Sequence, residues 1–162
     1  MDEKLWSYIS KKGDPPDALR FSTDPYADIA TQFTHNHPEG LKSARAVVAS
    51  ITISLQGVHK EDIKRRIEKI YGYRLDSPLD EIRKTYSFNE TCQETVPEAI
   101  TAFLESHNYV SAVQNAISLG GDADTLAAIA EAYYQEIPEE LVAFAESKLP
   151  QEIWDVLVPK SK

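Results

Sequence analysis

The chain has 162 residues, 42% of them hydrophobic, with 26 acidic against 17 basic side chains and a net charge of -9. It is long enough for one domain with a buried core, and its charge disfavours broad contact with nucleic-acid phosphates or anionic membranes. Cys92 is the single cysteine, which excludes an internal disulfide. No apolar run approaches the roughly 20 residues that span a bilayer, and the first residues lack a signal-peptide pattern. We therefore expect a cytoplasmic protein without nucleic-acid or membrane partners.

The segments that follow the first residues read as helices almost throughout. Residues 1–22, with "GDPPD" among them, are expected to form a loose arm, and 23–162 a single helical domain. Apolar side chains recur at helical spacing over 41–55 and 60–71, each followed by a glycine. The β-branched stretch "AVVASITISL" could be a strand, but its apolar spacing favours a helix. The basic residues of 60–69 alternate with acidic ones, which is typical of a solvated helix face.

The second half of the chain continues the pattern. "SPLD" (77–80) and "TVPE" (95–98) resemble capping boxes, which predict one helix to about Tyr86 and another through Leu104. Further helices are expected at 109–118, at 122–136, and after Pro138 and Pro150. Core candidates in the last two are Leu141, Phe144, Ile153, Trp154 and Leu157. The predicted fold class is all-α, a compact multi-helix bundle.

One stretch carries a chemical pattern: "SLGGDADTLAAIAEAYY" (118–134), where two glycines precede two aspartates and a helix. Aspartate at a helix start caps free backbone N–H groups. Within one helix, Asp122 and Asp124 would point about 200° apart. If Asp122 lies in the turn and Asp124 in the first helical turn, both carboxylates can converge with the Thr125 hydroxyl, a set of oxygens that suits Mg²⁺. Spacing alone leaves capping and metal binding both open.

Several blocks resemble one family in the same order. They are "THNHPEGLKSARAVVASI" (34–51), "YGYRLDSPLDEIRKTYSF" (71–88) and "CQETVPEAITAFLESHNYVSAVQNAISLGGDADT" (92–125), the last ending in the stretch above. The sequence resembles the ADP-ribosylglycohydrolase family, which includes the dinitrogenase-reductase-activating glycohydrolase, in its C-terminal part. The resemblance implies an all-helical fold that binds ADP-ribose or an ADP-ribosylated protein, commonly with magnesium.

The resemblance also assigns roles to residues. Asp122, Asp124 and Thr125 match a cluster of metal ligands, here for Mg²⁺. Gly120 and Gly121 match glycines that let the backbone approach the substrate, and His35 matches a histidine near the ADP-ribose. A turn in which His35 bonds to backbone is an equal alternative for that residue. A zinc site at His35 and His37 is not expected, and no catalytic base or nucleophile is identifiable.

The sequence also departs from the family pattern. Members are about twice this length, and their N-terminal half supplies a Thr-Asp-Asp metal cluster that is not found here. The sequence therefore predicts an incomplete magnesium site, with two alternatives for function. One is metal-assisted hydrolysis or binding of an ADP-ribosyl group, completed by a homo-oligomer or a complementing chain. The other is a non-catalytic interaction module that binds a protein partner. An exposed apolar face is expected around Val47, Ile51, Phe103, Ile129 and Tyr133.

Overall fold

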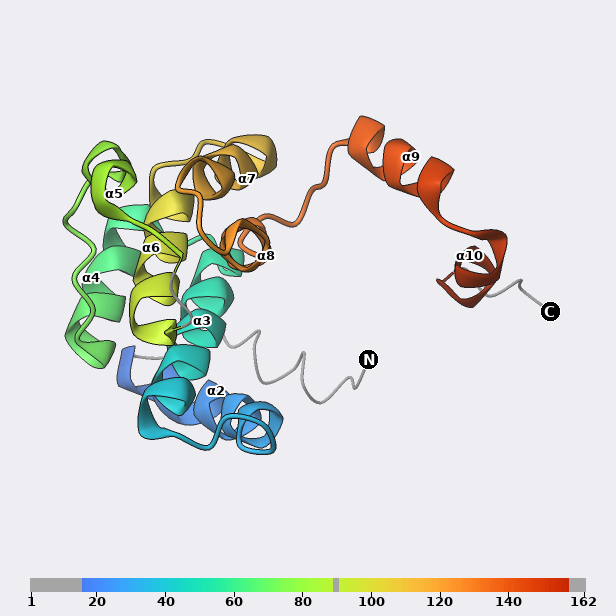
Figure 1. Cartoon of the computed structure of the whole chain (residues 1–162). Coiled ribbons are helices and arrows are strands. Elements are labelled where there is room, and N and C mark those ends of the chain that lie inside the picture. Colours follow the sequence, from blue (N-terminus) through green and yellow to red (C-terminus); the bar gives the residue numbers. More distant parts are fainter. Residues whose placement is uncertain (1–15, 89–90, 158–162) are drawn as a thin grey trace.

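The computed structural model describes residues 16–88 and 91–157, and every regular element in these ranges is an α-helix. In chain order the helices are α2 (Pro16–Thr31), α3 (Pro38–Leu55), α4 (Lys60–Tyr71), α5 (Leu79–Thr85), α6 (Cys92–Leu104), α7 (Tyr109–Ser118), α8 (Ala123–Glu131), α9 (Glu139–Lys148) and α10 (Gln151–Leu157) (Figure 1). The predicted all-α fold class is confirmed. The ambiguous β-branched stretch lies in the second half of α3.

Several helix boundaries differ from the expected ones, and α3, for example, begins at Pro38 and not at residue 41. Helix α2 begins at Pro16, inside the segment 1–22, and residues 1–15 lie outside the described part. Helix α6 begins three residues before Thr95, because Thr91 is its N-cap in extended backbone, so Pro97 lies inside the helix. Helix α8 ends at Glu131, since the next residues form a turn with Tyr134 N–H donating to the Glu131 carbonyl.

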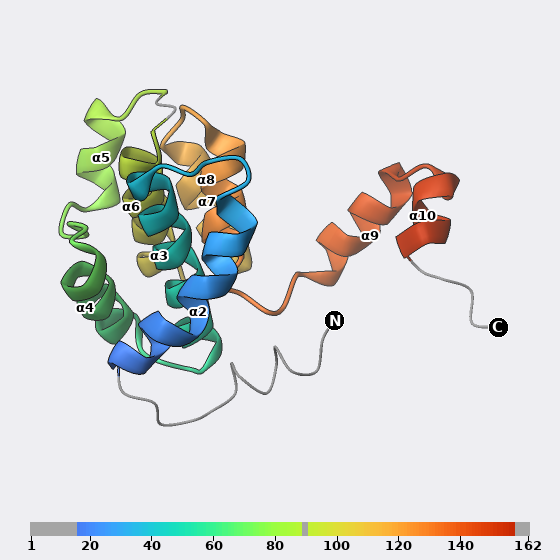
Figure 2. The same cartoon turned by 90° about the horizontal axis from the view of Figure 1, so that it is seen from below.

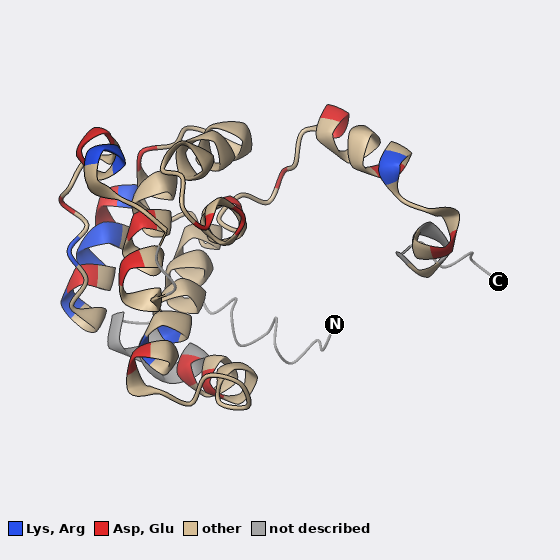
Figure 3. Ribbon diagram, in the orientation of Figure 1, with Lys and Arg blue, Asp and Glu red and all other residues tan. Residues whose placement is uncertain are grey.

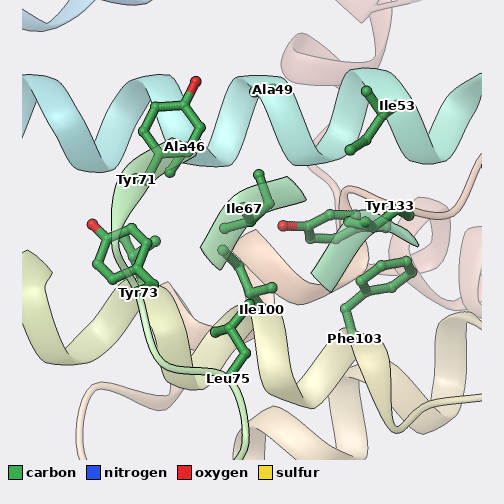
Figure 4. Close-up of a cluster of buried hydrophobic side chains, with 12 residues drawn as sticks. Ala46, Ala49, Ile53, Ile67, Tyr71, Tyr73, Leu75, Ile100, Phe103 and Tyr133 are labelled. Carbon is green, nitrogen blue, oxygen red and sulfur yellow. The ribbon is translucent and has the colours of Figure 1, made fainter. Parts of the chain in front are cut away.

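The larger of two buried clusters lies between α3, α4 and α6 (Figure 4). Its members include Ala46, Ala49, Ile53, Ile63, Ile67, Tyr71, Tyr73, Leu75, Val96, Ile100, Phe103 and Tyr133. Burial of this apolar surface is the main stabilising contribution to the fold, at roughly 25 cal/mol per Å² removed from water. Tyr133 enters this cluster from the turn after α8, so the end of α8 is fixed by the core.

A second cluster joins α5, α6, α7 and α8 on the other side of α6. Five of its buried residues are alanines: Ala99, Ala102, Ala112, Ala116 and Ala130. Small side chains let helix backbones approach closely, and Asn115 Nδ2 also donates across this contact to the Ala102 carbonyl at 3.1 Å. Helix α6 therefore lies between the two clusters and positions α8, which begins at the Gly-Gly-Asp turn.

Lys60 ties the start of α4 to the end of α6. Its ammonium group donates to the Phe103 carbonyl at 2.6 Å and to the Ser106 carbonyl, and it also bonds the Tyr134 hydroxyl at 3.2 Å. The Phe103 carbonyl also accepts the Ser106 N–H at 3.0 Å, and both carbonyls lie at or just after the end of α6, so the cation faces the negative end of that helix.

The last two helices stand apart from the rest of the described chain in both views (Figures 1 and 2). No residue of α9 is buried, and Leu141, Phe144 and Ile153 are exposed. The prediction that these three are core residues is wrong, because no described helix packs over them. The other two candidates, Trp154 and Leu157, have side chains outside the described set.

The expected exposed apolar face is wrong at two of its five positions. Phe103 and Tyr133 are only 2% and 4% exposed. Their rings stack with centroids 3.9 Å apart, which covers each with the other. Val47, Ile51 and Ile129 are partly buried at the edge of the larger cluster.

Most of the described Lys and Arg side chains lie on α4 and in the segment that leads through α5 (Figure 3). Several have acidic neighbours, such as Lys64 with Asp76 at 2.8 Å and Lys84 with Glu81 at 2.6 Å. Exposed ion pairs of this kind contribute little to stability. No helix in 16–88 or 91–157 is long and apolar enough to cross a membrane.

Candidate functional site

The turn that leads into α8 is built by two glycines in left-handed backbone. Gly120 has φ +75° and Gly121 has φ +63°, a conformation that costs other residues about 1–2 kcal/mol. At Gly121 a Cβ would also lie 2.9 Å from Tyr86 Cε1 and 3.2 Å from Phe88 Cα. Gly121 thus lets the 86–88 backbone pass against the turn, whereas Gly120 needs only its backbone freedom.

Asp122 is the N-cap residue of α8 but does not use its side chain as a cap. Asp124, in the first turn, accepts the Thr125 N–H at 3.0 Å. A hydrogen bond with the Asp122 carboxyl, followed by backbone N–H donors of Thr125 and Asp124, lowers the pKa of Asp124. The two carboxyl groups therefore lie close together, with Asp122 in the turn and Asp124 in the helix. Bonding to a backbone N–H at the helix start explains an aspartate at position 124. It does not explain one at position 122, because the Asp122 side chain makes no cap bond.

Asp122 and Thr125 open onto a cavity of about 500 Å³. Its walls come from α2, α3, α6 and α8, and its lining residues are Ala27, Ala30, Thr31, His35, Gly40, Ser43, Ala44, Val47, Val48, Cys92, Thr95, Val96, Asp122, Thr125 and Ile129. Alanine, valine and isoleucine side chains form the apolar walls, and the hydroxyls, His35 and Asp122 supply polar groups. No Lys or Arg is among these lining residues.

His35 reaches this cavity from the turn after α2. Its backbone N–H donates to the Thr31 carbonyl at 2.8 Å, and its ring Nδ1 lies 2.9 Å from the Thr34 hydroxyl. A Cβ at Gly40 would lie 3.0 Å from the His35 carbonyl, so the turn packs closely on the start of α3. The ring is held by a neighbouring hydroxyl and not by backbone. His37 has a different place: its Nδ1 accepts the Glu39 N–H and caps α3.

The structure thus brings together some of the residues that the sequence singles out and separates others. His35, Asp122 and Thr125 line one cavity, while Asp124, Gly120 and Gly121 do not line it. Within the described ranges, no three His, Cys, Asp or Glu side chains gather closely enough to hold a metal ion. The side-chain oxygens of this turn belong to Asp122, Asp124 and Thr125.

Comparison with known proteins places the whole helical body in one family. A model of the ADP-ribosylglycohydrolase family matches residues 9–142, which is most of the chain. The chain belongs to the ADP-ribosylglycohydrolase family. The match ends within α9, so this ADP-ribosylglycohydrolase family member carries the rest of α9 and all of α10 beyond it. No curated protein and no solved structure matches the chain.

A second cavity of this family member has a volume of about 360 Å³. Its lining includes Tyr86, Glu94 and Glu98. Burial, and then repulsion from Glu94 one helical turn away, raises the pKa of Glu98 to about 7. The sequence reasoning placed Glu98 in a helix cap and missed it. The available signal was two glutamates four residues apart in an otherwise apolar helix.

Proposed function

We propose that the chain binds an ADP-ribosyl group at the 500 Å³ cavity, with Asp122, Thr125 and His35 as the contacts that recognise sugar hydroxyls. One observation carries this proposal: His35, from the turn after α2, and the Asp122–Thr125 turn, far away in sequence, line the same cavity. Membership of the ADP-ribosylglycohydrolase family supplies the class of ligand.

The lining chemistry supports an orientation for that ligand. Carboxylate, imidazole and hydroxyl groups can each exchange hydrogen bonds with ribose hydroxyls. The alanine and valine walls suit the apolar faces of a sugar or a base, and no lining residue offers a fixed positive charge for the diphosphate. We therefore place a ribose inside the cavity and the diphosphate outside it, towards solvent and backbone N–H groups.

Magnesium fits the donor chemistry of this turn. Asp122, Asp124 and Thr125 offer hard oxygen ligands, and the Asp122 carboxylate is not used as a helix cap. When bound there, the ion would polarise a ligand oxygen and fix the position of the sugar. Neutralising two neighbouring carboxylates also removes their mutual repulsion.

Hydrolysis needs more than these residues. The cavity lining contains one carboxylate, Asp122, and the lining residues include no second acid or base beyond His35 and Cys92. We propose ligand binding as the function that this chain performs alone, and turnover only where a second chain adds carboxylates. A non-catalytic interaction module that binds a protein partner is the second candidate, favoured by the same shortage of ionisable groups in the cavity lining.

Isothermal titration calorimetry with ADP-ribose, with and without magnesium, tests the proposal. We expect binding that magnesium strengthens, and weaker binding by Asp122→Asn and Thr125→Ala. ADP without the terminal ribose should bind more weakly than ADP-ribose, since it lacks the sugar assigned to the cavity. Glu136→Gln, an exposed carboxylate before α9, is the matched control and should bind as the wild type does. Absence of ADP-ribose binding in both conditions would contradict the proposal.

A further inference from the structure

The first turns of helix α6 border two cavities. Cys92, Thr95 and Val96 line the 500 Å³ cavity, hereafter the ligand cavity. Glu94 and Glu98, from the same turns of the helix, line the 360 Å³ cavity, hereafter the Glu98 cavity. The two cavities therefore share one stretch of helix as a wall. A change in one cavity can reach the other through a side chain that contacts both sides of this arrangement.

Tyr86, the residue after α5, is such a side chain. It lines the Glu98 cavity together with Glu98, and its Cε1 lies 2.9 Å from the position of a Cβ at Gly121. Gly121 immediately precedes Asp122, which lines the ligand cavity. A shift of the Tyr86 ring therefore changes the support of residues 120–122, hereafter the ligand turn.

The Tyr86 hydroxyl is buried and makes no hydrogen bond of regular geometry. Burial raises the pKa of this hydroxyl, and the nearby Thr95 lowers it. The charges of Glu98, Asp122 and Glu94 then raise that pKa, in this order. One carboxylate of the Glu98 cavity and one of the ligand cavity thus lie near the same hydroxyl. A buried donor without an acceptor is unfavourable, so the hydroxyl will bond an acceptor that becomes strong enough.

Glu98 changes its charge close to neutral pH. Burial, and then repulsion from Glu94, raises its pKa to about 7. The other charged or titratable residues that line its cavity are Arg74, Glu81, Glu94 and Tyr86. Within the described ranges, α3, α4, α7 and α8 add no charged side chain to this lining. Ionised Glu98 is a stronger acceptor for the Tyr86 hydroxyl than the neutral acid, because charge-assisted hydrogen bonds are about twice as strong as neutral ones.

We propose that Tyr86 is a positioning residue for the ligand turn, and that the protonation state of Glu98 sets its position. While Glu98 is neutral, the Tyr86 ring stays against Gly121 and supports Asp122 in the cavity wall. When Glu98 ionises, the Tyr86 hydroxyl donates to its carboxylate, the ring moves away from Gly121, and Asp122 is held less firmly. The affinity for an ADP-ribosyl group then falls as the pH rises through 7. This regulation rests on the ligand site proposed above.

Nuclear magnetic resonance of the full chain without ligand tests the coupling itself. The chain has six glycines, so labelling with ¹⁵N-glycine gives few amide signals, which single substitutions assign. We expect the Gly121 signal to titrate with a midpoint near pH 7 in the wild type, and not in Glu98→Gln, whose amide cannot ionise. Tyr86→Phe should also abolish this titration, although Glu98 still ionises there.

Gly57 is the internal control for this measurement. It is left-handed like Gly121, but a Cβ there would meet no atom within 4 Å, so its signal should not follow Glu98. A Gly121 signal that does not titrate in the wild type, or a titration that survives either substitution, overturns the proposal.

Calorimetric titration with ADP-ribose at pH 6 and pH 8, without magnesium, measures the effect on binding. We expect about fivefold weaker binding at pH 8 in the wild type. Glu98→Gln should bind at pH 8 as tightly as the wild type does at pH 6. This variant retains His35, the titratable imidazole of the ligand cavity, so the comparison separates the two groups. Glu81→Gln, at an exposed carboxylate of the Glu98 cavity, is the matched control and should keep the wild-type difference.

The two measurements fail in different ways. A pH dependence of the affinity that is unchanged in Glu98→Gln overturns the proposed regulation. If ADP-ribose binds at neither pH while the Gly121 signal titrates as expected, the coupling is supported and the proposed ligand is wrong.

Discussion

The rings of Phe103 and Tyr133 stack with centroids 3.9 Å apart and planes 9° from parallel. The Tyr133 hydroxyl meets Ser50 Oγ at 2.7 Å, so one side chain joins α6 and α3 to the turn after α8. Ser50 also bonds the Ala46 carbonyl, at 2.7 Å. The end of α8 is held by a stacked ring and a buried hydroxyl together.

Tyr133→Phe separates these two contributions. The stacking remains and the buried hydroxyl bond is lost, while Ser50 keeps its bond to the Ala46 carbonyl. We expect a loss of about 1 kcal/mol in the free energy of unfolding, measured by urea denaturation. Tyr26→Phe, at an exposed position, is the control and should be neutral. An equal effect of both substitutions would contradict the role of the Ser50 contact.

The pH dependence of the free energy of unfolding should reflect the ionisation of Glu98. Its pKa in the folded protein is about 7, above the ordinary value of 4.5, so the folded state keeps a proton that the unfolded chain releases. Stability from this group is then fully present below pH 4.5 and is lost as the pH rises towards 7. Because the side chain is only half-buried, the loss should be about 1–2 kcal/mol.

Glu98→Gln tests this dependence, because the amide cannot ionise. The variant should be more stable than the wild type at pH 8, and its stability should change less between pH 5 and pH 8, both measured by urea unfolding. Glu136→Gln, an exposed carboxylate, should leave the wild-type dependence in place. If Glu98→Gln retains the full wild-type slope, another group is responsible.

The two glycines before α8 should differ in their tolerance of a side chain. Gly120→Ala places a Cβ in open space and should cost about 1 kcal/mol for its left-handed backbone. Gly121→Ala meets Tyr86 and the Phe88 backbone as well, and should cost about 1–3 kcal/mol more. Gly57→Ala, also left-handed and open, is the control and should match Gly120→Ala in denaturation. Equal losses at Gly120 and Gly121 would contradict the close contact with Phe88.

Magnesium should stabilise the wild type through the carboxylates at the start of α8. Without the metal, Asp122→Asn should be no less stable than the wild type, because the Asp122 side chain makes no cap bond. With millimolar magnesium, the wild-type melting temperature should rise by a few degrees and that of Asp122→Asn should not. Differential scanning fluorimetry measures both. If magnesium does not change the wild-type melting temperature, with or without ADP-ribose, these aspartates have structural roles only.

Lys60→Met should weaken the junction between α4 and α6. The variant keeps the apolar stem but removes the cation from the Phe103 and Ser106 carbonyls, of which Phe103 keeps the Ser106 N–H, at a cost of about 1–2 kcal/mol in the free energy of unfolding. Lys84→Met, which removes an exposed partner of Glu81, should cost about 0.5 kcal/mol or less. Similar losses in a denaturant titration would show that the Lys60 contacts add nothing beyond surface charge.

Helical periodicity predicted the positions of the helices between residues 41 and 131 but not α2 (Pro16–Thr31), whose start lies in the expected loose segment 1–22. Strong stops such as Gly72, left-handed at the end of α4, also fixed their boundaries. The sequence was less informative at "TVPE", since a threonine, a proline and a glutamate in that order also fit within a helix whose cap lies at Thr91. A local capping pattern does not indicate whether helical residues already precede it.

Tertiary contacts explain the remaining differences. Leu141 and Phe144 have the apolar character of core residues, but whether a partner helix covers them depends on the direction of the Gln135–Pro138 link. At the site, spacing alone allowed Asp122 and Asp124 to converge. That His35 lines the same cavity depends on α2, α3 and α8 packing together, which no local pattern encodes.

The contacts of Tyr134 fix the position at which the chain leaves the other helices towards α9 and α10. Its hydroxyl is held by Ser106 at 2.7 Å and by Lys60 at 3.2 Å, immediately before the link begins. Because Tyr134 is bonded to the junction of α4 and α6, that junction resists a displacement of α9 and α10 before the displacement is passed on to α8. Asp122 and Thr125 lie at the opposite end of that helix, away from the anchored end, whereas Ile129 of the cavity wall lies close to it.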